Sequence, residues 1–162
     1  MSDTPKAITR HALIALLNED LSREFQAVIA YVVYSQTIKG PQYMAIAKEL
    51  EGHAAQELQH ALTIAKQIDY LGGTPTTTPR TVMMSPKTEA MLRFDLENEG
   101  ETIMNYRERV RQCEALGEFA LADEIRAILR TEQEHQIDLA TALDIAVPVL
   151  PDGPVPARHK RR

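Results

Sequence analysis

Residues 57–60 read Glu-Leu-Gln-His, and residues 132–135 read Glu-Gln-Glu-His. Both segments have the form Glu-x-x-His, and each lies in a stretch with apolar residues at every third or fourth position. This period is typical of an α-helix with one buried face. A separation of three residues places both side chains on the same helix face. We therefore expect both motifs to point into a protein core from two separate helices.

The two motifs belong to an internal repeat. A glutamate precedes each motif by 33 residues, and the second half of the chain repeats the first at an offset of 75 residues. Chance produces roughly 0.5 Glu-x-x-His segments in a chain of this composition, and two copies with the same upstream glutamate about once in several hundred chains. The paired positions are Glu24/Glu99, Glu57/Glu132, His60/His135, Tyr31/Tyr106 and Asp20/Asp95.

Proline and glycine positions divide the chain into four long helical segments. A proline inside a helix costs about 3 kcal/mol, so long helices are expected where prolines are absent. No segment shows the period-two alternation of strands. The sequence thus predicts an all-α protein, with helices at 7–38, 42–71, 87–115 and 118–146.

The lengths of the connections predict the topology. The first and last helix pairs are joined by two or three residues, which makes them antiparallel hairpins, whereas residues 74–86 form a long Thr/Pro-rich connector. Extended, this connector spans about 43 Å, close to the roughly 45 Å of the second predicted helix. It can therefore run the length of a four-helix bundle with one long crossover. We expect the bundle to occupy residues 1–147, followed by a Pro-rich basic C-terminal tail at 148–162.

The apolar stripe of each predicted helix carries one glutamate near its middle. Four ionised carboxylates in one core repel one another, and each costs several kcal/mol without a partner. Either these groups are protonated or positive charge lies among them, and no lysine or arginine interrupts the stripes. Bound metal is the simpler explanation, and carboxylates with imidazoles suit iron or manganese. The predicted metal ligands are Glu24, Glu57, His60, Glu99, Glu132 and His135.

Composition excludes several classes of protein. The 162 residues are 44% hydrophobic with a net charge of −5, which is typical of a globular domain and not of a disordered chain or a general nucleic-acid binder. No apolar run is long enough to span a membrane, and the first residues lack a secretory signal. The single cysteine, Cys113, excludes an internal disulfide, so we expect a cytoplasmic protein.

The tail at 158–162 carries four positive charges. It is either solvated, in weak contact with DNA, or bound to a neighbouring subunit.

On these motifs the chain resembles the ferritin-like superfamily, and especially the di-iron bacterioferritins and Dps-like mini-ferritins. The resemblance covers about residues 8–146 and is clearest in Glu24-Phe25-Gln26-Ala27 with Tyr31, and in Ile128-Leu129-Arg130 with Glu132 and His135. It implies two iron ions per subunit, bridged by Glu57 and Glu132. Glu24 with His60 would complete one iron site, and Glu99 with His135 the other. Tyr31 would lie beside the irons as a catalytic residue that donates an electron or a hydrogen bond.

The resemblance also implies a function: a ferroxidase that oxidises Fe(II) with dioxygen or peroxide, for iron storage, detoxification and protection from oxidative stress. Two alternatives remain, namely a di-manganese or di-iron catalase or peroxidase, and a DNA-protecting assembly protein with a structural metal. Leu58 stands where bacterioferritin has its haem-binding methionine, so we do not expect haem by that route. Prolines after residue 147 disfavour the fifth helix of 24-subunit ferritins. The expected homo-oligomer is therefore a 12-subunit cage or a dimer.

Three further polar positions keep two interpretations each. Asp20 and Asp95 lie one helical turn before Glu24 and Glu99, where they either orient the histidines or face solvent. His53 lies two turns before His60, and it either lines an entry path or occupies an outer or surface position.

Overall fold

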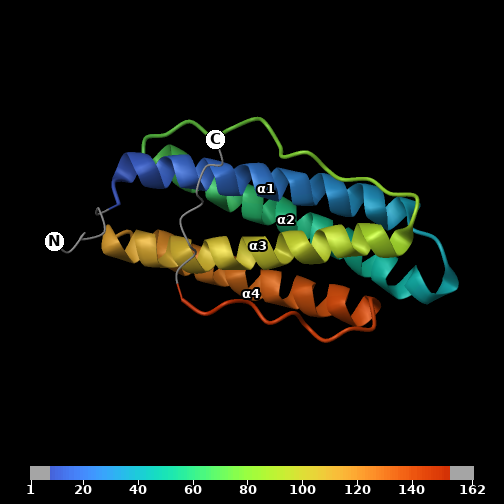
Figure 1. Cartoon of the computed structure of the whole chain (residues 1–162). Helices are drawn as coiled ribbons and strands as arrows, with labels where there is room; N and C mark the ends of the chain where they lie inside the picture. Colours follow the sequence, from blue (N-terminus) through green and yellow to red (C-terminus); the bar gives the residue numbers. More distant parts are fainter. Residues whose placement is uncertain (1–7, 154–162) are drawn as a thin grey trace, which may run out of the picture.

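The computed structural model describes residues 8–153 and shows a bundle of four long helices joined by one extended crossover (Figure 1). The helices are α1 (Arg10–Thr37), α2 (Met44–Tyr70), α3 (Thr88–Ala115) and α4 (Phe119–Ala142), and a short 3₁₀ turn (Pro41–Tyr43) precedes α2. No strand occurs among the described residues. The expected all-α fold and its topology are confirmed: α1 and α2 form one antiparallel hairpin, α3 and α4 the other, and α2 and α3 run parallel.

Local sequence explains where the helices begin and end. Thr9 caps α1, because its hydroxyl accepts a hydrogen bond from the backbone N–H of Ala12 at 3.1 Å. The α3–α4 turn passes through Gly117, whose φ of 77° lies in the left-handed region that glycine adopts without a steric penalty.

The predicted end of the last helix is wrong by four residues, since α4 ends at Ala142 and not at residue 146. Asp144 takes a left-handed φ of 53°, and the N–H of Ile145 donates back to the carbonyl of Ala140 at 3.1 Å. This turn closes the helix before Pro148 is reached. Beyond α4 the described residues form no further helix, as the prolines of this segment predict.

The crossover lies along α1 and is attached to it by side chains spaced one turn apart. Asn18 donates to the carbonyl of Thr74 at 3.1 Å, and Ser22 to that of Thr78 at 2.7 Å. Gln26 donates to the carbonyl of Thr81 at 2.7 Å. This row of contacts satisfies backbone groups that a helix or sheet would otherwise satisfy.

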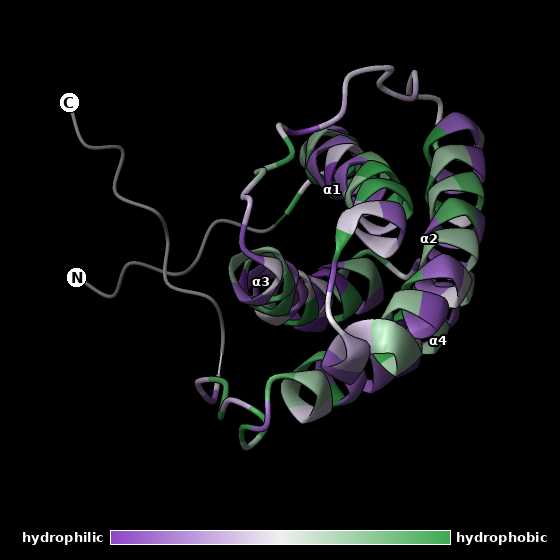
Figure 2. Ribbon diagram, turned by 90° about the vertical axis from the view of Figure 1, so that its right-hand side faces the viewer, coloured by the Kyte–Doolittle hydropathy of each residue, from purple (hydrophilic) through white to green (hydrophobic). Residues whose placement is uncertain are grey.

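The interior consists of two apolar clusters, one toward each end of the bundle. Viewed nearly along the bundle, the four helices surround this common interior (Figure 2). One cluster includes Leu17 and Ile125, and the other includes Leu50 and Leu92. On every helix, the predicted metal ligands lie between the two clusters. The fold therefore encloses a polar layer between two apolar ones.

Candidate metal centre

All six predicted ligands lie in this central layer, and each is at most 6% exposed to solvent. One glutamate comes from each helix, and α2 and α4 each add a histidine one turn further along. The structure thus brings together every residue that the repeat singled out as a metal ligand. The six are Glu24, Glu57, His60, Glu99, Glu132 and His135.

The six side chains form two overlapping groups of four. Glu24 and His60 complete one group, Glu99 and His135 complete the other, and Glu57 and Glu132 belong to both. Within each group, one potential ligand atom per residue lies within 4.8 Å of all the others. This is the division into two terminal pairs and two shared carboxylates that two adjacent metal ions require.

Each histidine turns its Nδ1 atom toward three carboxylates. His60 Nδ1 lies 3.0 Å from Glu57, 3.3 Å from Glu132 and 3.5 Å from Glu24. His135 Nδ1 lies 2.9 Å from Glu57, 3.2 Å from Glu132 and 3.5 Å from Glu99. Contacts related by the repeat therefore agree to within about 0.4 Å: the histidine lies 3.0 or 3.2 Å from the glutamate of its own motif, 3.3 or 2.9 Å from that of the other motif, and 3.5 Å from the third glutamate in both halves.

Several of these buried atoms make no well-oriented hydrogen bond with any described residue: Glu24 Oε2, Glu57 Oε1, Glu132 Oε2 and His135 Nδ1. They lie 2.9–3.5 Å from oppositely charged atoms of the same cluster, without the geometry of a hydrogen bond, and converge on the same space. Their lone pairs suit a cation, so the donor set fits a pair of metal ions.

Burial and mutual contact shift the pKa values of these groups strongly. Burial alone lowers the pKa of His60, but its contacts with Glu132, Glu24 and Glu57 raise it to about 12. The same balance of burial against carboxylate contacts raises the pKa of His135 to about 12. Burial, together with repulsion from Glu132, Glu24 and Glu99, raises the pKa of Glu57 well above its usual range. In the metal-free protein, protons thus supply the positive charge that the carboxylates need.

Two tyrosines fix the outer carboxylates. Tyr31 on α1 donates a hydrogen bond to Glu99 on α3, and Tyr106 on α3 donates one to Glu24 on α1. Both rings are buried. The sequence pointed to Tyr31 alone as a functional residue, although the 75-residue repeat already paired it with Tyr106.

One group outside the six ligands orients a histidine, and it is not one of the two predicted aspartates. His135 donates from Nε2 to Oε1 of Gln56 at 2.7 Å, which leaves its Nδ1 facing the carboxylates. Asp20 instead binds Arg109, with a shortest contact of 2.7 Å, and Asp95 is buried without a hydrogen bond to a histidine. No sequence pattern points to Gln56, because its role depends on how α2 and α4 face each other.

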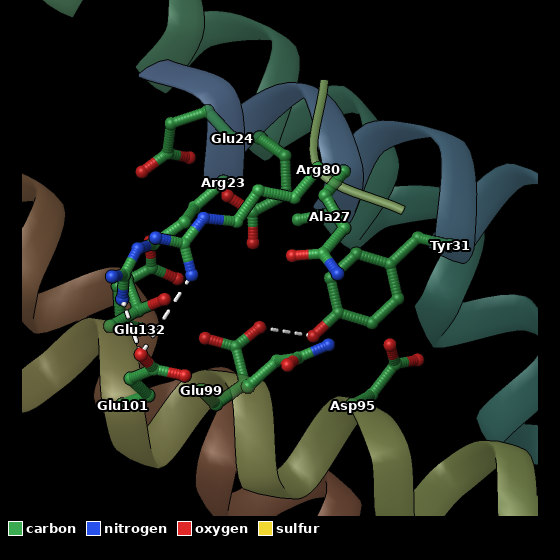
Figure 3. Close-up of a pocket in the computed structure, with 13 residues that line it drawn as sticks. Arg23, Glu24, Ala27, Tyr31, Arg80, Asp95, Glu99, Glu101 and Glu132 are labelled. Carbon is green, nitrogen blue, oxygen red and sulfur yellow. Dashed lines mark hydrogen bonds and ion pairs between the residues drawn. The ribbon is translucent and has the colours of Figure 1, made fainter. Parts of the chain in front are cut away.

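A small cavity adjoins the ligands between α1 and α3 (Figure 3). Its volume of about 20 Å³ is enough for one water molecule. At its mouth, Arg23 on α1 lies 3.1 Å from Glu101 on α3, and Arg80 of the crossover lies 3.9 Å from the same carboxylate. The crossover therefore supplies one wall of the approach to the site.

Comparison with known proteins agrees with this geometry. The bacterioferritin of Brucella melitensis is 26% identical over 90% of this chain and 87% of the relative, and that of Desulfovibrio desulfuricans is 27% identical over 76% and 69%. A ferritin-like diiron-carboxylate protein of Bacillus anthracis superposes with a TM-score of 0.79 at 33% identity, over 83% of this chain and 96% of that one.

A bacterioferritin-related protein of Bacteroides fragilis, described as a dodecameric thioferritin, superposes with a TM-score of 0.78 at 26% identity over 85% of this chain and 88% of that one. Residues 14–146 match the model of the ferritin-like domain. The chain therefore belongs to the ferritin-like family.

Proposed function

We propose that the protein is a ferroxidase whose six central residues bind two iron ions per chain and promote the oxidation of Fe(II). The observation that carries this proposal is the pair of four-residue groups sharing Glu57 and Glu132. A site for a single ion has no need of a second terminal glutamate and histidine. The bacterioferritins among the relatives support iron as the metal.

The roles of the ligands follow from their positions. Glu57 and Glu132 would bridge the two ions, with Glu24 and His60 on one side and Glu99 and His135 on the other. Bound there, iron supplies one-electron redox chemistry, with dioxygen or peroxide as the oxidant. Mixed carboxylate and imidazole ligands also accept manganese, which is the alternative metal.

The protein around the ligands prepares them for this chemistry. The apolar clusters on both sides exclude bulk water, which strengthens the electrostatic interaction between the carboxylates and a cation. Tyr31 and Tyr106 each bind one oxygen of an outer carboxylate and so hold it in place. Glu24 turns its other oxygen, Oε2, toward His60, whereas in Glu99 the bonded oxygen, Oε1, itself lies 3.5 Å from His135. We propose Tyr31 as the electron donor, because its ring also lies edge-on to His135 at 5.8 Å.

We also propose that the protein acts as a homo-oligomer, which iron storage requires. Ile29 and Val32 on α1, with Leu58 and Leu62 on α2, expose 41–57% of their surface in the isolated chain. Apolar residues of this size on neighbouring helices suit a subunit interface. The relative described as dodecameric, and the lack of a helix among residues 143–153, favour a 12-subunit cage or a dimer over a 24-subunit cage.

Two variants with matched controls test the ferroxidase proposal. Glu57→Ala and Glu132→Ala should abolish rapid Fe(II) oxidation, followed by absorbance after anaerobic loading and exposure to oxygen. Glu51→Ala and Glu134→Ala alter exposed glutamates on the same two helices and should keep the wild-type rate. Circular dichroism should show a helical fold in all four. Wild-type rates in both site variants would overturn the proposal, and rapid oxygen evolution from peroxide with manganese bound would favour the catalase alternative.

A further inference from the structure

We propose that Glu49, His53 and Asp138 form a separate site for one divalent cation on the α2–α4 side of the bundle. One potential ligand atom from each of the three residues lies within 4.8 Å of the other two. Glu49 and His53 lie one turn apart on α2, and Asp138 lies on α4. None of the three belongs to the six residues of the central centre.

The ligands combine an imidazole with two carboxylates. Nε2 of His53 lies 3.0 Å from Oδ2 of Asp138, so the ring points its outer nitrogen at the carboxylate. One histidine and two acidic groups bind first-row metals such as iron, manganese and zinc. With three protein ligands, such a site keeps positions open for water or for exchange of the ion.

A hydrogen bond between His53 and Asp138 accounts for only part of this arrangement. Glu49 brings a second carboxylate to the same place, and no lysine or arginine among residues 8–153 forms an ion pair with Glu49 or Asp138. The His53 side chain is only 4% exposed, and its Nδ1 has no hydrogen-bond partner in the described chain. Asp138 thus makes the polar contact of a ring that is otherwise held by aromatic neighbours, and a cation would neutralise two adjacent carboxylates.

The site differs from the central centre in its access to solvent. Glu49 is exposed and 40% of the Asp138 side chain is exposed, whereas the six central ligands are enclosed. A cation can thus reach this outer site directly from water. An ion bound there would be held more weakly, because its ligands are partly hydrated.

The position of His53 links the two sites. Its ring stacks on that of His135 with centroids 3.9 Å apart and an interplanar angle of 26°. A single imidazole ring therefore separates the outer site from a ligand of the central pair. We infer that the outer site holds a cation on its way to or from the central centre; this role, unlike the binding itself, rests on the proposed function.

Zinc titration of the metal-free protein tests the outer site, because Zn²⁺ is redox-inert and can be located in crystals by anomalous scattering. The wild-type chain should bind three ions, with one anomalous peak between Glu49, His53 and Asp138. Asp138→Asn and Glu49→Gln should each reduce the number to two. His53 is left intact because it supports His135. Glu51→Gln, on the exposed face of α2, is the matched control and should keep three.

A central-site variant separates this proposal from the proposed function. Glu132→Ala should disrupt the central pair and still bind one zinc ion at the outer site, and adding Glu49→Gln should remove that ion. The outer site would be overturned if the wild type bound two ions and showed no outer peak. It would also be overturned if the third ion persisted in Asp138→Asn and Glu49→Gln. If Glu132→Ala kept the outer ion and oxidised iron at an unchanged rate, only the ferroxidase proposal would be overturned.

The inferred role has its own readout. If the outer site passes iron to the central centre, Glu49→Gln should slow Fe(II) oxidation several-fold at low iron concentration and leave the rate at saturating iron unchanged. An equal effect at both concentrations would contradict the passage of ions through this site.

Discussion

The hydroxyl of Tyr106 on α3 donates a hydrogen bond to Oε1 of Glu24 on α1. The bond from Tyr31 to Glu99 is the equivalent contact in the other half of the repeat. The two bonds cross the same pair of helices in opposite directions. Each therefore controls the carboxylate of one proposed metal position and leaves the other position untouched.

Removing one hydroxyl should weaken one metal position selectively. A hydrogen bond to a charged group contributes about 1.5–3 kcal/mol, which corresponds to roughly a 10- to 100-fold change in affinity. Tyr106→Phe should weaken binding beside Glu24 by this factor, and Tyr31→Phe binding beside Glu99. Calorimetric titration with Mn²⁺ measures both. Tyr34→Phe loses a hydroxyl that binds the carbonyl of Met83 in the crossover, so its metal affinity should equal that of the wild type.

Metal binding should release protons. Because the metal-free pKa values of His60 and His135 are raised to about 12, both rings are protonated at pH 7 and must lose a proton to bind a metal. Loading the central pair should thus release at least two protons per chain, and affinity should fall as the pH falls. Calorimetry in buffers with different ionisation enthalpies counts these protons, and identical heats in every buffer would contradict the prediction.

Breaking the buried pair of Asp20 and Arg109 should destabilise the protein by about 3–5 kcal/mol, because one uncompensated charge remains in the core. Urea unfolding of Arg109→Ala measures this loss. Arg111→Ala removes a surface pair with Glu108 and should cost less than about 1 kcal/mol. Replacing both buried partners, as in Asp20→Leu with Arg109→Met, should recover most of the stability. A single variant as stable as the surface control would show that Arg109 is not needed.

Cys113 should be unreactive in the folded protein. Its side chain is fully buried, and burial raises the pKa of its thiol to about 12, so almost no thiolate forms at pH 8. A disulfide exchange reagent should label it completely in denaturant and several orders of magnitude more slowly without denaturant. Rapid labelling of the native chain would show that the end of the bundle around Cys113 opens readily.

The sequence predicted the fold and the central cluster well because both depend on local helix geometry. A spacing of three residues places Glu57 beside His60 whatever lies around them, and the repeat placed the same pattern on two helix pairs. Breakers at Gly40-Pro41 and Gly117 set the hairpins. The end of α4 was harder, because the left-handed turn at Asp144 has no strong signal in its residue type.

Contacts between residues far apart in the chain could not be predicted from the sequence. The apolar stripes appeared free of basic residues, yet Arg109 is buried on α3 beside Asp20, 89 positions away. Its guanidinium donates to Asp20 and Gln112, so it leaves the central carboxylates unneutralised. The contact of Gln56 with His135, like that of His53 with Asp138, depends on the rotation of α2 against α4, which no local pattern encodes. The basic tail at 158–162 lies outside the described residues, and its contact with DNA stays a prediction.

The attachment of the crossover has a consequence for how this chain can vary in evolution. The groups that α1 binds are the backbone carbonyls of residues 74, 78 and 81 and the backbone N–H groups of residues 76 and 80, which every amino acid supplies except proline at the last two positions. Residues of the crossover can therefore drift with little effect on its path, with the exception of Arg80 at the cavity mouth. Asn18, Ser22 and Gln26 must instead keep side chains that can bind the crossover. The path of this loop is therefore determined by the sequence of α1.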